Sequence, residues 1–334
     1  MTMRARFSAA DGTAPSDSGP SDSGPWSLAR FAAVLSLLAL ASCVARNGQT
    51  YDGGQVPRPV QDLRMPAEDG LILAVIGTGI QGAWTDAAPG VRARLDEQRW
   101  ERARQELGAR ADLLTYASGG LRVGAALVRP ELVSGRRMPV VILCRDGLGG
   151  DAMSLDALLV ELEGWSREGY VAIASLYRGH RMSQGSDERG APADVLALLP
   201  LVKELGYADP ERIYLLGQGH GAERVVRTLA ASSVVRAAAI VGAPLAAQPT
   251  PTGIAGVPDL DGLDEPLLVV HGDRDRRAPL ARARTLTDAL TAADRAPELF
   301  VVEDGDETLV RHAREVDEQV ASWFAAHGGR SLVN

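Results

Sequence analysis

Lysine is nearly absent from this chain of 334 residues: Lys203 is the single lysine, although lysine and arginine together number 35. Acidic residues outnumber basic ones, and the formal net charge is -8. The arginines do not gather into a basic stripe that could follow a phosphate backbone. Nucleic acid is therefore not an expected partner.

Aromatic residues and cysteine are also scarce. Aromatic side chains make up 4% of the chain and hydrophobic residues 46%, so we expect one main globular domain with an aliphatic core. The two cysteines are Cys43 and Cys144. If Cys43 belongs to an N-terminal signal, Cys144 stands alone in the mature chain and an internal disulfide is excluded. We predict that Cys144 lies at a buried strand end.

An apolar run near the N-terminus, residues 31–40, is too short to span a bilayer core of roughly 30 Å. It continues into LASC, which ends at Cys43 and matches the bacterial lipobox, where the cysteine thiol receives diacylglycerol. We interpret residues 1–43 as a lipoprotein signal peptide, with an ordinary signal peptide as the alternative. We therefore expect a lipid-anchored protein of the cell envelope with the membrane as partner. Because Val44 follows the cysteine, the outer membrane of a Gram-negative cell is open as the destination.

Two segments precede the regular part of the sequence. Residues 44–70 combine glycine, proline and polar side chains without apolar periodicity, which is typical of a flexible tether. Residues 71–112 form an N-terminal extension. It contains a strand-like run LILAVI, the motif GTGIQG, and a charged segment whose apolar residues have helical spacing.

The motif GTGIQG, with Gly77, Gly79 and Gly82, fits the GxGxxG pattern of dinucleotide sites. Such a site also needs an acidic residue at the end of a second strand about 20 residues further on. Asp96 and Glu97 instead lie inside the charged helical segment. A glycine-rich turn is the simpler interpretation, and we expect no cofactor.

From residue 113 to 327 the pattern becomes regular. Two alternating segments flank a turn at 118–120, and short continuous apolar runs follow, typical of strands buried on both faces of a parallel sheet. This pattern predicts a doubly wound α/β fold, a mostly parallel sheet with helices on both faces. The expected strands are MPVVILC, YVAIASLY, RIYLLG, AAAIVGA, PLLVVHG and ELFVVED, and the expected helices are 153–168, 190–205, 221–233, 279–293 and 307–327. Residues 244–266 are predicted to form a surface loop or a small lid.

The segment GQGHG at 217–221 lies between a strand and a helix, where α/β hydrolases carry GxSxG. In that elbow the outer glycines let strand and helix approach closely, and the central residue has a strained backbone. Gly219 is the central residue here; it lacks a hydroxyl and accepts a positive φ at no steric cost. His220 follows at the helix start, where the macrodipole disfavours imidazolium. We expect His220 to be packed or to cap the helix.

The order of several motifs resembles the catalytic domain of the prolyl oligopeptidase family, within the α/β-hydrolase superfamily. The motifs are YASGGLRVGAALVRPE, RRMPVVILCRDG, EGYVAIASLYRGH, DVLALLPLVKELGYADPERIYLLGQGHG and LLVVHGDRD. The resemblance implies that Asp275 is the acid that orients the catalytic histidine. It places Glu307 at the histidine position itself, with Asp306 as the alternative register.

The same resemblance places Arg145, Asp146 and Gly147 where the family has His-Gly-Gly, whose backbone N–H groups hold the developing oxyanion. A carboxylate at this point would repel an oxyanion. A surface ion pair between Asp146 and Arg145 is the simpler role. In either case we expect altered oxyanion-loop positions, to which His220, after the central residue of the elbow, also belongs.

The histidines do not supply an obvious replacement base. His271 stands four residues before Asp275 and is expected to be structural. His312 is five residues beyond the expected position and is predicted to lie within the last helix, so its use would require loop remodelling. No pair of histidines has metal-ligand spacing with a third ligand, so no metal is expected.

Loss of the nucleophile, the histidine and the oxyanion loop together favours disuse, since removal of one triad member already costs several orders of magnitude in rate. We predict a catalytically inactive homologue with a binding or scaffold role, whose old cleft takes a peptide or a small molecule. The alternative is an active hydrolase, a peptidase or esterase. Its nucleophile would be displaced to Ser175, Ser183 or Ser186, or its chemistry would use Asp275, Glu307 and Asp306.

Overall fold

The computed structural model describes residues 68–132, 134–145, 154–180, 182–186, 190–245, 249–250, 253–254 and 262–329. All of them belong to one compact unit, Pro57–Asn334. Cys43, the signal peptide proposed for residues 1–43 and nearly all of the tether lie outside the described residues. Asp146 and Gly147 of the oxyanion loop lie outside them as well.

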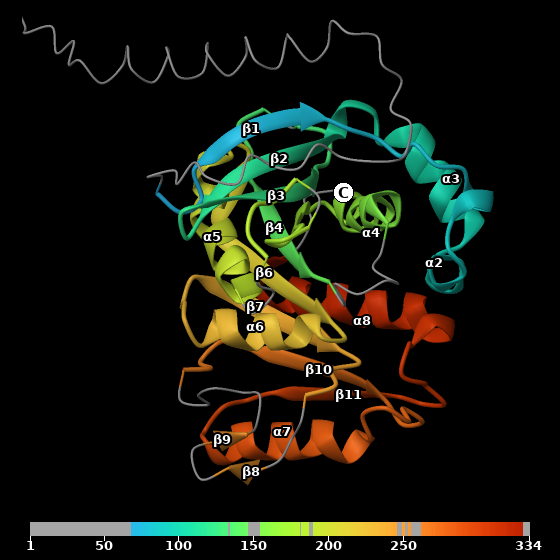
Figure 1. Ribbon diagram of the computed structural model, residues 1–334. Helices are drawn as coiled ribbons and strands as arrows, with labels where there is room; N and C mark the ends of the chain where they lie inside the picture. The colour runs from blue at the N-terminus through green and yellow to red at the C-terminus, as the bar shows by residue number, and fades with distance from the viewer. Residues whose placement is uncertain are drawn as a thin grey trace, which may run out of the picture. The chain divides into compact units, whose positions relative to one another are not determined.

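Nine strands of the described part form one sheet in the order β1-β2-β3-β5-β4-β6-β7-β10-β11 (Figure 1). The strands from β4 onward pair in parallel, while β1, β2 and β3 form an antiparallel edge. The predicted mostly parallel sheet is therefore confirmed. The strands are β1 (Ile72–Gly77), β2 (Ala111–Ser118), β3 (Leu121–Val128), β4 (Met138–Cys144), β5 (Val171–Ser175), β6 (Ala208–Gln218), β7 (Val235–Val241), β10 (Leu267–Gly272) and β11 (Glu298–Val302).

Helices cover both faces of this sheet, and two apolar cores result (Figure 1). One core takes side chains from α5, α6 and α7, and the other from α3, α4 and α8. Strands such as β4 are buried along their whole length, which explains why their sequences are continuously apolar. The helices are α2 (Pro89–Arg94), α3 (Glu97–Glu106), α4 (Leu155–Arg167), α5 (Ala191–Glu204), α6 (Gly221–Leu229), α7 (Leu280–Ala292) and α8 (Ala313–Phe324).

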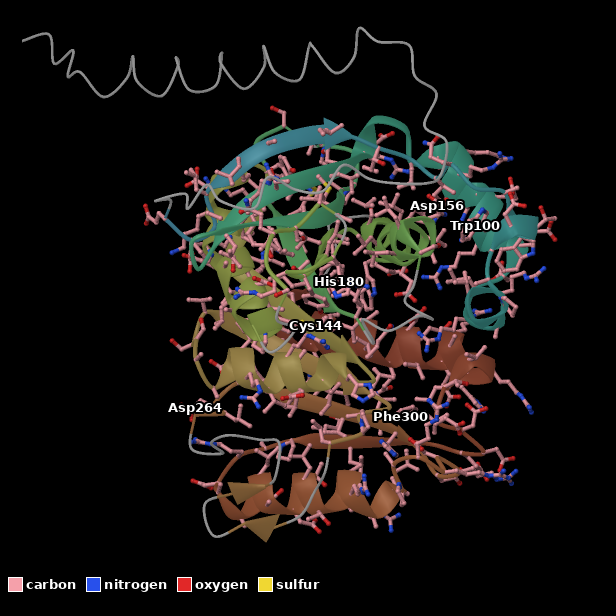
Figure 2. All side chains as sticks on the ribbon, viewed as in Figure 1. Trp100, Cys144, Asp156, His180, Asp264 and Phe300 are labelled. Atoms are coloured by element: carbon pink, nitrogen blue, oxygen red, sulfur yellow. The ribbon has the colours of Figure 1, made fainter. Side chains whose placement is uncertain are left out.

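The segment 71–112, which we treated as an extension, contributes to this same sheet and core. Strand β1 pairs with β2, so the sheet begins at Ile72 rather than at residue 113. Trp100 of α3 is 2% exposed and its indole N–H donates to the carbonyl of Gly82 at 3.2 Å. Figure 2 labels Trp100 near Asp156 of α4, whose carboxylate accepts the amide N–H groups of Gln81 and Gly82.

These contacts also decide the role of the GTGIQG motif. Strand β1 is an antiparallel edge strand, whereas a dinucleotide unit needs a parallel strand that leads into a helix N-terminus. Two amides of the turn are already bound to Asp156. The motif is a glycine-rich turn that fastens the edge strand to α4.

The end of the chain differs from the prediction of one helix over 307–327. Helix α8 begins at Ala313, after a turn and the short 3-10 helix η4 (Val310–His312). The carboxylate of Asp306 accepts the amides of Thr308 and Leu309, and Leu309 has a φ of 51°. A left-handed residue interrupts the right-handed helix, so His312 precedes α8 instead of lying within it.

The predicted loop at 244–266 is described only in part. Strands β8 (Pro249–Thr250) and β9 (Gly253–Ile254) pair there in antiparallel orientation. Cys144 ends β4 and is fully buried, as predicted, and burial raises the pKa of its thiol to about 12. Among the helices of the described residues, none is both long and apolar enough to cross a bilayer.

Candidate functional site

The elbow after β6 has the geometry predicted from its three glycines. Gly219 has a φ of 53°, in the left-handed region, and its N–H donates to the carbonyl of Val241 at 2.9 Å. A Cβ atom on Gly221 would overlap the carbonyl oxygen of Cys144, and one on Gly217 would lie 2.9 Å from the backbone of α6. The outer glycines therefore permit the close approach of strand and helix, and Gly219 adopts its backbone without steric strain.

His220 does not have the predicted packed or capping role. It occupies the N-cap position of α6, but its side chain is exposed and makes no capping hydrogen bond. Its backbone angles, φ -66° and ψ -15°, are already helical. An N-cap side chain reaches the first-turn amides from an extended backbone, which explains the difference.

The resemblance gives two candidates for the histidine position, Glu307 and Asp306, and both lie in the turn after β11. The Oδ1 atom of Asp306 accepts from Thr308 N at 2.9 Å, Thr308 Oγ1 at 2.6 Å and Leu309 N at 3.0 Å. These hydrogen bonds lower the pKa of Asp306. Asp306 is thus committed to its own turn, whereas Glu307 lines a cavity together with Gly219.

Asp275 lies in the loop after β10 and is 7% exposed. Its Oδ1 atom accepts the amides of Arg277 and Ala278 at 2.8 and 2.7 Å, and its Oδ2 atom lies 3.3 Å from His271 Nε2. That nitrogen also lies 2.6 Å from the carbonyl of Ala278, so it faces two acceptors and must carry its hydrogen. Asp275 and His271 therefore stabilise their own loop. Arg277, whose amide binds Asp275, also has its Nε 3.9 Å from Glu307 Oε1.

The cavity above the elbow has a volume of about 110 Å³. The buried side chains of Leu95, Trp165, Leu309 and Val316 form its apolar wall. Three carboxyl groups and two guanidinium groups also line it: Glu161, Glu307, Asp317, Arg94 and Arg99. Among the described residues no serine, cysteine or histidine lines this cavity, and its one hydroxyl group, on Thr308, donates to Asp306.

Two of these carboxyl groups have a raised pKa, the buried Glu161 and the partly exposed Asp317. Burial raises the pKa of Glu161 to about 7, and the charges of Arg99 and Arg94 lower it in part. The pKa of Asp317 is also raised by burial, although Arg99 Nη1 lies 3.5 Å from Asp317 Oδ2. The Oε2 atom of Glu161 has no hydrogen-bond partner within the described part of the chain. Sequence patterning did not reveal Glu161, because an acidic residue within a helix ordinarily faces solvent.

Arg145 is not the surface residue that we expected. It is 4% exposed, its Nη2 donates to the carbonyl of Leu176 at 3.3 Å, and its guanidinium lies 5.1 Å from the Tyr177 ring centre. Arg224 stacks on the same ring at 4.6 Å. Two backbone carbonyls and an aromatic ring hold the buried guanidinium in the interior, because a buried charge needs such partners.

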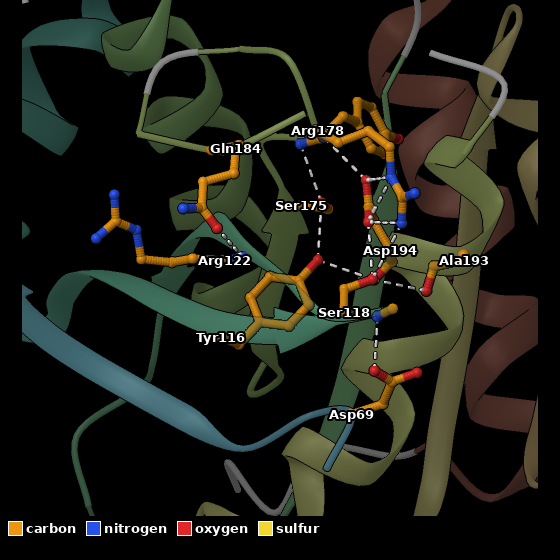
Figure 3. Close-up of polar contacts among 12 residues, drawn as sticks. Asp69, Tyr116, Ser118, Arg122, Ser175, Arg178, Gln184, Ala193 and Asp194 are labelled. Carbon is orange, nitrogen blue, oxygen red and sulfur yellow. Dashed lines mark hydrogen bonds and ion pairs between the residues drawn. The ribbon is translucent and has the colours of Figure 1, made fainter. Parts of the chain in front are cut away.

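The serines considered as displaced nucleophiles differ in burial. Ser175 is 1% exposed and its hydroxyl contacts Tyr116 Oη at 2.9 Å (Figure 3), while it also accepts the amide of Tyr177. Ser183 is 3% exposed and accepts the amide of Gly124. Ser186 is exposed, and it does not line the cavity.

Figure 3 also shows the buried ion pair that positions the loop after β5. Asp194 of α5 is fully buried and accepts from Arg178 N at 2.8 Å, Arg178 Nη2 at 2.7 Å and Ser118 Oγ at 2.8 Å. The backbone and side chain of Arg178 thus bind one carboxylate. The network joins β2, the end of β5 and α5, and both carboxylate oxygens of Asp194 accept hydrogen bonds within it.

The described residues contain no group of three or more histidine, cysteine or acidic side chains arranged to hold an ion. Thus the site consists of the elbow at Gly219, the Glu307 turn, the buried Glu161 of α4, and the partly exposed ion pair between Arg99 of α3 and Asp317 of α8.

A mostly parallel sheet flanked by helices, with a glycine-lined elbow after β6 and acidic loops after β10 and β11, defines the class: this chain has an α/β-hydrolase fold. No family model and no curated protein matches the sequence. Solved structures do match it, at identities low enough that the likeness shows the fold alone.

Among them is a Klebsiella pneumoniae protein assigned as a dienelactone hydrolase, 20% identical with a TM-score of 0.51, covering 64% of this chain and 98% of that one. Esterase 2 of Thermogutta terrifontis is 17% identical with a TM-score of 0.54, covering 67% and 97%. The acylaminoacyl peptidase of Pyrococcus horikoshii is 17% identical with a TM-score of 0.53; the match covers 64% of this chain but only 41% of the peptidase. The resemblance to prolyl oligopeptidase-type hydrolases is confirmed at the level of the fold.

Proposed function

We propose that this protein is a non-catalytic α/β-hydrolase homologue that binds a ligand in the cleft above its elbow. The observation that carries the proposal is the cavity shared by Gly219 and Glu307. In an active serine hydrolase a hydroxyl and an imidazole would meet at such a point. Here a bare glycine and a carboxylate line it instead.

The surrounding groups support a role in binding. The acid Asp275 is bound to the amides of its own loop, and Asp306 is bound to its own turn. Arg145, at the aligned oxyanion position, points its charge toward buried carbonyls. Of the three carboxylates considered for catalysis, Asp275, Glu307 and Asp306, only Glu307 lines the cavity.

A displaced serine is the second candidate, and the structure offers little for it. Ser175 and Ser183 are buried and hydrogen-bonded to neighbouring groups. His312 lies 3.4 Å from Glu315 through its Nδ1 atom and does not line the cavity. A nucleophile needs a base within hydrogen-bond reach, and none of these residues pairs with one in the described structure.

We also propose that the protein is anchored in the cell envelope by acylation of Cys43. The support is the lipobox sequence that ends at this cysteine. Mass spectrometry of the protein from membranes of its source cells would detect the diacylglyceryl cysteine. Recovery of an unmodified chain that begins at another residue would contradict the proposal.

The catalytic proposal is tested by restoring the missing groups. The double variant Gly219→Ser with Glu307→His is expected to cleave p-nitrophenyl butyrate, while the native protein and each single variant do not. The control is Gly219→Ser with His312→Ala, which should stay inactive. Measurable turnover by the purified native protein would contradict the proposal.

A further inference from the structure

Glu161 is an unusual residue for the wall of a cavity. It is 8% exposed, it lines the cavity beside Gly219, and its Oε2 atom has no hydrogen-bond partner within the described part of the chain. A buried polar atom without a partner is destabilising, and more so when it is charged. Oε2 is itself buried, so the carboxylate must turn about its terminal torsion before a ligand in the cavity can donate a hydrogen bond to it and remove this cost.

The charges around the cavity indicate the sign of that ligand. Asp317 and Arg99 form an ion pair at 3.5 Å, so their charges largely compensate each other. Arg94 also lines the cavity, and its charge lowers the pKa of Glu161 without a hydrogen bond to Oε2. Glu307 is 29% exposed, and its ion-pair partner Arg277 is 3.9 Å away, 81% exposed and outside the cavity lining. The lining itself therefore has three carboxyl groups and two guanidinium groups, and a cation would balance the negative charge that remains when Glu161 is ionised.

The apolar wall indicates the shape of the ligand. Leu95, Leu309 and Val316 are buried aliphatic residues, and Trp165 adds an aromatic ring that can attract a cation. A volume of about 110 Å³ is well below the roughly 300–1,000 Å³ of a site for drug-sized molecules, so only a group of side-chain size fits. An open groove of about 970 Å³ shares Arg94, Leu95, Arg99, Trp165 and Asp317 with the cavity and could hold the remainder of a larger ligand.

We infer that the cavity binds a primary ammonium group at the end of an alkyl chain, with the chain against Trp165, Leu309 and Val316 and the ammonium on Glu161. This inference rests on the proposed binding function of the cleft and names its ligand class. The terminal torsion of a glutamate side chain is soft, so the carboxylate can turn either oxygen toward the ammonium. Gly219 keeps the neighbouring space free of a side chain.

The pH dependence of binding follows from the same geometry. The pKa of Glu161 is about 7, and the charged groups that face it are Arg94 and Arg99 from the N-terminal helices and Asp317 from α8. An alkylammonium group, with a pKa near 10.4, stays charged across the range. Ammonium binding should therefore strengthen as pH rises and Glu161 ionises, by about tenfold between pH 6 and pH 8.

The test is an NMR titration of the ¹⁵N-labelled full chain with n-butylammonium, n-butyrate and n-butanol. We expect saturable shifts of the Trp165 indole signal, assigned with Trp165→Phe, for n-butylammonium only, with at least tenfold weaker binding of the other two. Glu161→Gln should weaken n-butylammonium binding at least tenfold. Glu163→Gln is the matched control on the same helix, because Glu163 is buried beside Arg167 and does not line the cavity.

Equal or stronger binding of n-butyrate or n-butanol, absence of saturation, or unchanged affinity in Glu161→Gln would overturn the inference. If Glu161→Gln does not fold, the native protein decides the matter alone, since an affinity that does not change from pH 6 to pH 8 contradicts a role for Glu161. Hydrolysis of p-nitrophenyl butyrate by the native protein would refute the non-catalytic function itself. Failure to bind the amine without hydrolysis refutes only the ligand class.

Discussion

Two buried charged regions of this molecule differ in how completely their polar groups are paired. Around Asp194, one carboxylate accepts hydrogen bonds from the backbone and side chain of Arg178 and from Ser118. Around Glu161, burial is nearly as deep, yet one carboxylate oxygen has no partner within the described residues. A saturated network fixes the relative positions of β2, β5 and α5, whereas an unsaturated group beside a cavity leaves a place for a ligand.

The largest expected effect is the loss of the saturated network. Asp194→Ala leaves the guanidinium of Arg178, 15% exposed, without its carboxylate, and should lower the free energy of unfolding by about 3–5 kcal/mol. Urea denaturation measures it. Asp209→Ala is the control, because its ion pair with Arg212 is more exposed and should cost about 1 kcal/mol or less. Similar losses of unfolding free energy in both variants would show that the buried network contributes no more to stability than the more exposed ion pair.

The second prediction concerns the unsaturated region and its pH dependence. Burial raises the pKa of Glu161 from 4.5 to about 7, so the folded protein disfavours the ionised form. The neutral form of Glu161 therefore contributes to the free energy of unfolding. This contribution is complete below pH 4.5 and is lost as pH rises through 7, with a total on the order of 3 kcal/mol. Glu161→Gln should remove this part of the pH dependence of unfolding. Identical pH profiles for the variant and the native protein would contradict it.

A smaller effect is expected at the elbow itself. Gly219→Ala places a Cβ atom on a residue with a φ of 53° and should cost about 1–2 kcal/mol by thermal or urea unfolding. Gly206→Ala is the matched control, since it has open space around the added methyl group and no positive φ. A stabilised Gly219→Ala would mean that the elbow backbone differs from the one described.

The smallest effect is expected on the exposed side of α8. Arg314 and Glu318 form an ion pair whose side chains are 92% and 65% exposed, so Arg314→Ala should leave the free energy of unfolding unchanged within the precision of the measurement. The unfolding midpoint in urea checks this. A loss comparable to that of Asp194→Ala would remove the contrast between buried and exposed pairs.

Much of the fold could be predicted from the sequence, because strands buried on both faces require continuous apolar runs such as β4 and β10. The elbow was predictable because close strand–helix approach requires glycine at 217 and 221. The place of β1 in the sheet was not predictable. Its outer residues are exposed, and its pairing with β2 depends on contacts distant in sequence.

The site was harder to predict than the fold for a related reason. Glu161 is buried because α3 packs against α4 and residues of α3 and α8 share one core with it, and helical periodicity within α4 carries no information about those neighbours. Arg145 was expected at the surface. It is buried because its guanidinium donates to the carbonyls of Ser175 and Leu176 and lies over the ring of Tyr177. Burial of charged groups is set by tertiary packing.

The proposed non-catalytic function depends most on the absence of a working nucleophile at Gly219. Labelling of the purified native protein with a serine-directed fluorophosphonate, followed by intact mass measurement, tests this absence directly, with Gly219→Ser plus Glu307→His as the positive comparison. We expect no mass increase in the native protein and one added phosphonyl group in the double variant. Stoichiometric labelling of the native chain would show that an active serine exists and would contradict the non-catalytic function.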